Sequence, residues 1–319
     1  MIQLIKGECL EAMKQIPSGS VDAIITDPPY GTTACKWDSV IPFEPMWEQL
    51  NRIIKPNGAI VLFSKQPFTS SLIMSNPKMF RYEWIWEKSQ GVNFAQCNHM
   101  PMSVYENITV FGNFGMSKNA KIQPVYNPQG VIEINKKKKA KTSTEHRVCD
   151  NNKDHVQKFG NYPRQIQKFA SERGLHPTQK PVALMEYLIK TYTNENEIVL
   201  DFTMGSGSTG VAAKNLNRKF IGIELDDKYF EIAKERIDNA KQEQENARKM
   251  TIIRKYKELM AKAHEAKSLY MELKTKDASK LTDANKEALK NLITSEYNDA
   301  LDYYNKAQEL KANNPNIIK

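Results

Sequence analysis

The sequence predicts an α/β fold built on a mostly parallel β-sheet. Short apolar runs that are typical of buried strands alternate with segments of helical periodicity, which is the pattern of βαβ units. One of these strands ends abruptly in Asp27-Pro28-Pro29-Tyr30, and another runs into the glycine-rich loop 202–210 ahead of a helix. Both turns therefore lie at the carboxyl ends of strands, where open α/β sheets bind their ligands.

The first 112 residues contain most of the predicted strands. Two prolines can neither continue a strand nor enter a helix, so the chain turns sharply after Asp27 and raises a carboxylate and an aromatic ring above the sheet. Taken alone, such a tetrapeptide also fits an ordinary turn. The predicted elements are strands at 2–5, 21–27, 59–63, 80–86 and 106–111, the last two as an antiparallel edge hairpin, and helices at 10–16 and 47–55.

Regular patterning fades between residues 112 and 176 and then returns. We interpret the irregular segment, which is rich in Asn, Gln, Lys and Gly, as an insertion. Pro181 suits the first turn of the helix that follows. The remaining elements are that helix through Ile189, a strand at 198–201, the glycine-rich loop, a strand at 220–224 and a helix at 229–240.

Beyond residue 240 the composition shifts to Lys, Glu, Ala and Leu. Apolar residues recur at alternating spacings of four and three from Ile252 to Leu273, and a second helical stretch from Leu289 to Ala307 follows a break near 276–283. We interpret the two stretches as an antiparallel helical hairpin. Its apolar stripe either packs on the preceding domain or forms a surface for a homodimer or another partner.

Composition and charge narrow the functional class. The 319 residues are 40% hydrophobic and 26% charged, and no apolar run reaches the roughly 18 residues of a membrane span, so we expect a cytoplasmic protein without a membrane partner. The four cysteines form no C-x-x-C pair, so we expect no metal site. Most of the net charge of +9 lies in residues 113–175, where thirteen Lys and Arg oppose five Asp and Glu. Either a polyanionic partner or a solvated loop accounts for this excess.

The glycine-rich loop has the features of a nucleotide-cofactor site. Gly205 and Gly207 allow a ligand to approach the backbone, and Glu224, which closes the next strand, can accept hydrogen bonds from ribose hydroxyls. The spacing does not complete the G-x-G-x-x-G pattern of dinucleotide enzymes, which also carry this unit near their start.

Five motifs follow one another in an informative order, with the proline turn first and the glycine-rich loop last. They are G-E-C-L-E-A-M from Gly7, T-D-P-P-Y-G from Thr26, H-P-T-Q-K-P from His176, D-F-T-M-G-S-G-S-T-G from Asp201 and I-G-I-E from Ile221. Together they resemble the β class of exocyclic-amino DNA methyltransferases, whose motifs are circularly permuted. The resemblance extends from Gly7 to about Ile237.

This resemblance implies a Rossmann-like, S-adenosylmethionine-dependent methyltransferase fold with a mixed seven-stranded sheet, from a bacterium or a phage. The strand at 2–5 would lie beside the strand of Glu224. The resemblance also divides the chain into four segments: a catalytic half at 1–112, a basic target-recognition insertion at 113–175, a cofactor-binding half of the same domain at 176–240, and a C-terminal helical extension, the helical hairpin, at 241–319.

The resemblance also implies which residues bind the cofactor and the base. Asp27, Pro28, Pro29 and Tyr30 would form the catalytic turn, in which Asp27 and the Pro28 carbonyl accept the two hydrogens of the target amino group and Tyr30 stacks on a flipped base. The family usually has Asp at the position of Glu8, and it usually has Asp-Pro-Phe where Phe202 here follows Asp201 directly. The cofactor-binding residues would be Glu8, Asp27, His176, Thr178, Lys180, Asp201, Phe202, Gly205, Gly207 and Glu224.

Double-stranded DNA is the expected partner of the basic insertion. Its lysines would neutralise phosphates, whereas Arg, Asn and Gln side chains read base edges. The candidates are Lys136, Lys137, Lys138 and Lys139 for phosphates and Asn161, Arg164 and Gln167 for bases.

Members of the resembled family that begin the motif with Asp mostly methylate adenine, so we expect adenine rather than cytosine. A methyltransferase acting on protein or RNA and a catalytically dead DNA-binding protein of the same fold are the alternatives. The permuted order argues against the first, and the intact motif residues argue against the second.

Overall fold

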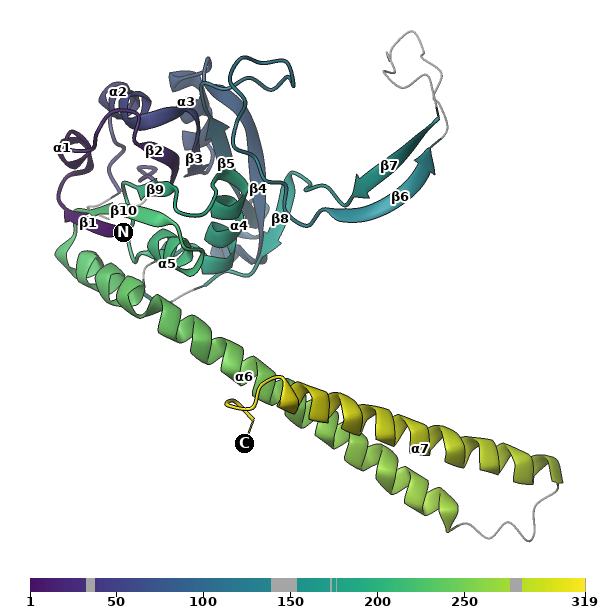
Figure 1. The fold of residues 1–319 in the computed structure, drawn as a ribbon. Coiled ribbons are helices and arrows are strands. Elements are labelled where there is room, and N and C mark those ends of the chain that lie inside the picture. The colour runs from purple at the N-terminus through teal and green to yellow at the C-terminus, as the bar shows by residue number, and fades with distance from the viewer. Residues whose placement is uncertain (33–37, 139–153, 173, 176, 276–282, 319) are drawn as a thin grey trace. The chain divides into compact units, whose positions relative to one another are not determined.

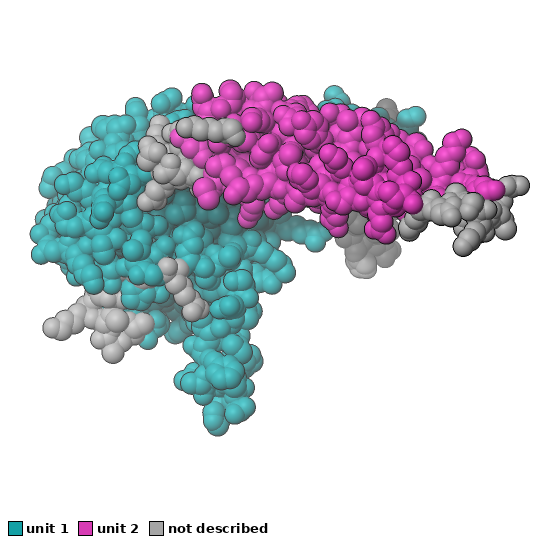
Figure 2. All heavy atoms as spheres, turned by 90° about the horizontal axis from the view of Figure 1, so that it is seen from below, with its two compact units in different colours: residues 1–240 teal, residues 241–319 magenta. Residues whose placement is uncertain are grey.

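The computed structural model describes residues 1–32, 38–138, 154–172, 174–175, 177–275 and 283–318. The chain divides into two units, residues 1–240 and 241–319, which Figure 2 shows in different colours. The first unit contains the β-strands and the cavity described below, and the second is helical. Among the described helices, none is both long enough and apolar enough to cross a membrane.

An eight-stranded mixed sheet forms the centre of the first unit (Figure 1). Its spatial order is β1-β10-β9-β2-β3-β5-β4-β8. Neighbours from β1 to β3 are parallel, β5 is antiparallel to both β3 and β4, and β8 is parallel to β4. The strands are β1 (Ile2–Lys6), β2 (Val21–Thr26), β3 (Ile54–Ser64), β4 (Phe80–Val92), β5 (Ser103–Phe111), β8 (Ile166–Phe169), β9 (Ile198–Asp201) and β10 (Lys219–Glu224).

The first strand of the chain, β1, pairs with β10, which is the last strand of the sheet in chain order. β1 lies parallel to β10 with Lys6 opposite Glu224, which confirms the position expected for residues 2–5. In the same sheet, β2 lies between β9 and β3, with Ile24 opposite both Leu200 and Ile60. The carboxyl ends of β2, β9 and β10 therefore meet at one edge of the sheet.

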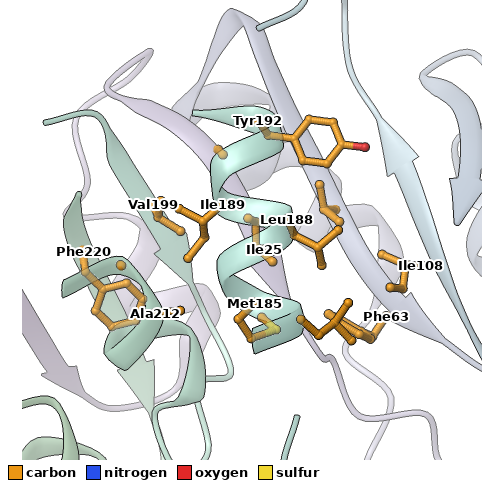
Figure 3. Close-up of a cluster of buried hydrophobic side chains, with 14 of the residues drawn as sticks. Ile25, Phe63, Ile108, Met185, Leu188, Ile189, Tyr192, Val199, Ala212 and Phe220 are labelled. Carbon is orange, nitrogen blue, oxygen red and sulfur yellow. The ribbon is translucent and has the colours of Figure 1, made fainter. Parts of the chain in front are cut away.

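Helices cover both faces of this sheet, as its buried strands require. Alternate residues of β2 point to opposite faces of the sheet. Ile24 packs in the core beneath α1, α2 and α3. Ala23 and Ile25 pack in the core beneath α4, α5 and the start of α6. Figure 3 shows α4 laying Met185 and Leu188 among the side chains of the strands. The helices are α1 (Cys9–Met13), α2 (Phe43–Ile53), α3 (Phe68–Ser75), α4 (Val182–Tyr192), α5 (Ser208–Asn215) and α6 (Asp227–Lys274).

The segment predicted to be irregular contains three strands, so that part of the prediction was wrong. β6 (Ile132–Lys138) and β7 (His155–Gly160) form a separate antiparallel pair, and β8 adds an eighth strand beside β4. The Trp86 indole donates to the Phe169 carbonyl at 2.9 Å and holds β8 in place. β4 and β5 are antiparallel as expected, but β8 rather than β4 forms the edge. The sequence analysis also missed α3 and the short 3-10 turn η1 (Phe94–Gln96).

In the second unit, the rest of α6 is followed by α7 (Asp283–Ala312). The Tyr270 and Tyr297 rings lie 5.3 Å apart and the Lys262 amine lies 5.6 Å from the Tyr303 ring, so the two helices run antiparallel. Residues 227–274 form one continuous helix rather than separate helices, because the intervening Lys, Gln, Glu and Ala residues are strong helix formers.

Candidate active site

A cavity of about 500 Å³ opens at the edge of the sheet where β2, β9 and β10 end. The turn after β2 forms one wall and the glycine-rich loop after β9 forms another. Glu224, the last residue of β10, also lines the cavity. Pro28, Pro29 and Phe202 supply apolar surface, whereas Asp27 and Glu224 supply carboxylates. Segments far apart in the sequence are therefore brought to one pocket by parallel strand order.

Asp27 is held from two sides. The Tyr30 hydroxyl donates to its Oδ1 and the Lys180 ammonium to its Oδ2. Burial raises the pKa of Asp27 and Lys180 offsets part of that rise. Burial and the adjacent Asp27 also raise the pKa of Tyr30 well above its ordinary value. The Tyr30 ring stacks on Phe68 of α3 at 5.1 Å, so neighbouring side chains hold both its hydroxyl and its ring.

Asp38 fixes the backbone of the proline turn after β2. Its carboxylate accepts the backbone N–H groups of Tyr30 at 2.8 Å, Gly31 at 2.9 Å and Thr32 at 2.9 Å, and its side chain is buried. A carboxylate with several N–H donors is a strong anchor for a loop. The sequence analysis missed Asp38, because no periodic pattern links it to the proline turn.

Lys180 connects Asp27 to a second buried carboxylate. Its Nζ lies 3.5 Å from Glu106 Oε2, and Lys88 binds the other Glu106 oxygen. Burial alone would lower the pKa of Lys180, but Asp27 and Glu106 outweigh it and raise the pKa. Burial opposes ionisation of Glu106, yet Lys180 and Lys88 lower its pKa. Lys180 was predicted to bind the cofactor, and the structure places its ammonium between Asp27 and Glu106.

Asp201 joins the two halves of the site. Its carboxylate accepts the hydroxyls of Thr26 at 2.6 Å and Thr209 at 2.5 Å and the Thr203 backbone N–H at 3.1 Å. Burial raises its pKa to about 6 despite these donors. Thr203 also donates to the Asp27 carbonyl at 3.1 Å. Asp201 therefore positions the glycine-rich loop against β2.

The glycine-rich loop requires its glycines at two positions. Gly205 has a φ of 51° and donates its N–H to Glu224 at 2.8 Å. Gly207 has a φ of 80°, and a Cβ there would lie 2.9 Å from the Cβ of Ala233. Glu224 also accepts the Asp226 N–H at 2.8 Å, and each carboxylate oxygen keeps a further lone pair for a ligand hydroxyl.

The other predicted cofactor residues surround the same cavity. Glu8 caps α1 by accepting the Glu11 N–H at 2.9 Å; burial opposes its ionisation, but the backbone donors lower its pKa. Phe202 is buried among the side chains beneath α1, and Thr178 lines the cavity beside Lys180. His176 lies outside the described residues.

The predicted DNA-contacting residues do not line the cavity. Lys136, Lys137 and Lys138 are exposed on β6, while Lys139 lies outside the described residues. The amides of Asn161 and Gln167 are engaged locally, donating to the Gly130 carbonyl at 2.7 Å and the Arg164 carbonyl at 2.6 Å. Arg164 itself is exposed.

Comparisons with known proteins give the family of the chain. Residues 21–235 match the family model N6_N4_Mtase, described as DNA methylase. The chain is 32% identical over 260 residues to the DNA adenine methyltransferase YhdJ of Escherichia coli, covering 74% of this chain and 83% of that protein. It is 30% identical over 251 residues to the Type II methyltransferase M.HpaI of Haemophilus parainfluenzae, covering 74% of each.

Solved structures show the same fold. The M1.HpyAVI-SAM complex matches with a TM-score of 0.53 and 27% identity over 74% of this chain and all of that one. The PvuII DNA methyltransferase, described as cytosine-N4-specific, matches with a TM-score of 0.53 and 14% identity over 73% of this chain and 84% of that one, a likeness of fold alone. With its proline turn, glycine-rich loop and permuted sheet order, this chain belongs to the N6_N4_Mtase family of DNA methylases.

Proposed function

We propose that this protein transfers a methyl group from S-adenosylmethionine to the exocyclic amino group of adenine in double-stranded DNA. The observation that carries the proposal is the half-buried Asp27 carboxylate on the proline turn, at the edge of a cavity that Glu224 also lines. Adenine is favoured because YhdJ, at 32% identity, is named an adenine methyltransferase, whereas the cytosine-specific structure supports only the fold.

The residues around the cavity fit the proposed cofactor. Glu8 suits the hydrogens of the adenine and Glu224 those of the ribose, Phe202 offers an apolar wall, and the Gly205–Gly207 backbone allows close approach. When bound, S-adenosylmethionine supplies an electrophilic methyl group on a sulfonium ion. Asp201 holds the loop by accepting hydrogen bonds from Thr26, Thr203 and Thr209.

The chain's part in the reaction is to position and deprotonate the amino group. An exocyclic amine is a poor nucleophile because its lone pair is delocalised into the ring. Asp27 and the Pro28 carbonyl accept its two hydrogens and direct the lone pair at the methyl carbon. As the C–N bond forms and the C–S bond breaks, the nitrogen loses one proton, and the raised pKa of Asp27 makes it the better acceptor.

In this proposal the basic insertion at residues 113–175 contacts the DNA. The target base flips into the cavity and stacks on Tyr30. Lys136–Lys139 neutralise phosphates, and Arg164, with its exposed guanidinium, reads a base edge together with Asn161 and Gln167. Residues 1–112 and 176–240 then serve as the catalytic and cofactor halves, and 113–175 as the recognition segment.

We further propose that the helices of the second unit form a surface for a homodimer or another partner. Tyr297, Leu301 and Tyr304 of α7 are exposed beside a groove of about 290 Å³ between the two helices. Sedimentation of the wild type and of a Tyr297→Ser/Tyr304→Ser variant tests this: a dimer only in the wild type supports it. We place the protein in the cytoplasm of a bacterial or phage-infected cell, where its DNA substrate lies.

Transfer of labelled methyl groups separates this function from its alternatives. The purified protein is incubated with labelled S-adenosylmethionine and, in parallel, with mixed genomic DNA, total RNA and a protein extract. Label in DNA alone is the expected result. Label in RNA or protein, or cofactor binding without any transfer, would support the other enzyme class or the dead-enzyme alternative.

A further inference from the structure

Both carboxylate oxygens of Asp27 are already engaged. Tyr30 donates to one and Lys180 to the other. Each of these oxygens can still accept one more hydrogen, but while Lys180 stays on Asp27 its charge lowers the pKa of the carboxyl and opposes proton transfer from a target amino group. Lys180 is the donor with another partner available, because its ammonium lies between two carboxylates.

One carboxylate oxygen of Glu106 can accept a further hydrogen bond. Its Oε2 is buried without a hydrogen-bond partner and lies 3.5 Å from the Lys180 ammonium. Its other oxygen is bound by Lys88, which is itself mostly buried on the neighbouring strand β4. A movement of Lys180 Nζ by less than about 1 Å would complete a normal hydrogen bond to Oε2.

We propose that Glu106, held by Lys88, is a positioning residue that takes Lys180 from Asp27 when the amino group of the target base arrives. This inference rests on the methyltransferase function proposed above. The exchange keeps both groups hydrogen-bonded: Lys180 gains Glu106, and Asp27 keeps the Tyr30 hydroxyl and gains one hydrogen of the amino group. Lys180 therefore keeps Asp27 satisfied in the free enzyme and releases it only in the complex.

The surroundings of Lys180 limit where its ammonium can go. It lies 5.1 Å from the Phe63 ring and donates to the Thr178 carbonyl at 3.3 Å. Lys180 and Asp27 line the cavity, whereas Glu106 does not. Glu106 consequently acts on the reaction through Lys180, and not by touching the base.

A double-mutant cycle tests this dependence. Single-turnover methylation is measured at saturating cofactor, on a short duplex carrying the sequence that the wild type methylates. Glu106→Gln should lower the rate about tenfold or more, the effect of one misplaced bond to a charged group. In a Lys180→Met background the same substitution should change the rate less than about twofold, because its target is gone. An equal loss in both backgrounds would overturn the proposal.

A matched control and a second readout separate this role from general damage. Glu83→Gln is the control, since Glu83 on β4 accepts a neutral amide bond from Asn107, at 2.9 Å, and should keep the wild-type rate. The second readout uses 2-aminopurine, which lacks the 6-amino group, at the target position, and its fluorescence rises when the base is flipped.

The two readouts should diverge in Glu106→Gln. We expect that variant to retain both equilibrium binding of S-adenosylmethionine and the fluorescence rise, while losing the methylation rate. Loss of all three together would show that Glu106 only supports the fold and would overturn the proposal. A wild type that methylates no DNA would instead refute the underlying function.

Discussion

The Thr26 hydroxyl donates to Asp201 at 2.6 Å, across the boundary between β2 and β9. These residues are 175 positions apart, and each directly precedes a loop of the cavity. One buried hydrogen bond to a carboxylate therefore ties the catalytic turn to the glycine-rich loop.

We expect Thr26→Val to weaken both loops. Removing one donor from buried Asp201 should lower the free energy of unfolding by about 1–3 kcal/mol and should weaken cofactor binding as well. Urea unfolding and equilibrium dialysis measure the two effects. Thr191→Val is the matched control: Thr191 is equally buried but donates to the Tyr187 carbonyl of its own helix, so it should leave cofactor binding intact.

Much of this arrangement was predictable from the sequence. Buried strands leave continuous apolar runs, so β2, β9 and β10 were found, and Asp27 and Glu224 followed because they close such runs. β6 and β7 were missed because most of their residues are exposed and mix Lys with apolar residues, which leaves no periodic signal. The pairing of Lys180 with Asp27 and Glu106 depends on tertiary structure that no local pattern records.

Asp38 should be necessary for a fixed catalytic turn. Asp38→Ala leaves three backbone N–H groups without their acceptor, so we expect the single-turnover rate to fall by about tenfold or more while the free energy of cofactor binding changes little. Asp302→Asn on α7, which only breaks an exposed ion pair with Lys306, should have no effect. Equal activity of the two variants would contradict the anchoring role.

Asp201 should contribute stability that is lost as pH rises from about 4 to 6. Burial raises the pKa of Asp201 from 3.8 to about 6, so the folded state binds more protons than the unfolded state in this interval. The shift corresponds to about 3 kcal/mol of stability that is present below the unfolded pKa and lost once Asp201 is ionised. Urea unfolding at several pH values should show this slope in the wild type and a smaller one in Asp201→Asn. Identical slopes would argue against a raised pKa.

Gly207→Ala should destabilise more than a simple backbone change. The new Cβ is strained by the positive φ and meets Ala233 at 2.9 Å, so we expect a loss of about 2–3 kcal/mol, from strain plus overpacking. Gly19→Ala is the control, because its φ of 60° carries the same strain but the position has nothing within 4 Å. Thermal unfolding of the two variants isolates the packing contribution, which is absent if their midpoints agree.

The identity of the methylated nucleoside tests both the role of Asp27 and the choice of base. Genomic DNA is treated with S-adenosylmethionine and either the wild type or Asp27→Ala, and its nucleosides are then resolved by mass spectrometry. We expect N6-methyladenine from the wild type and none from Asp27→Ala, although that variant still binds the cofactor. Amino-methylated cytosine would keep the mechanism and contradict the choice of base. Equal methylation by both proteins would contradict the role of Asp27.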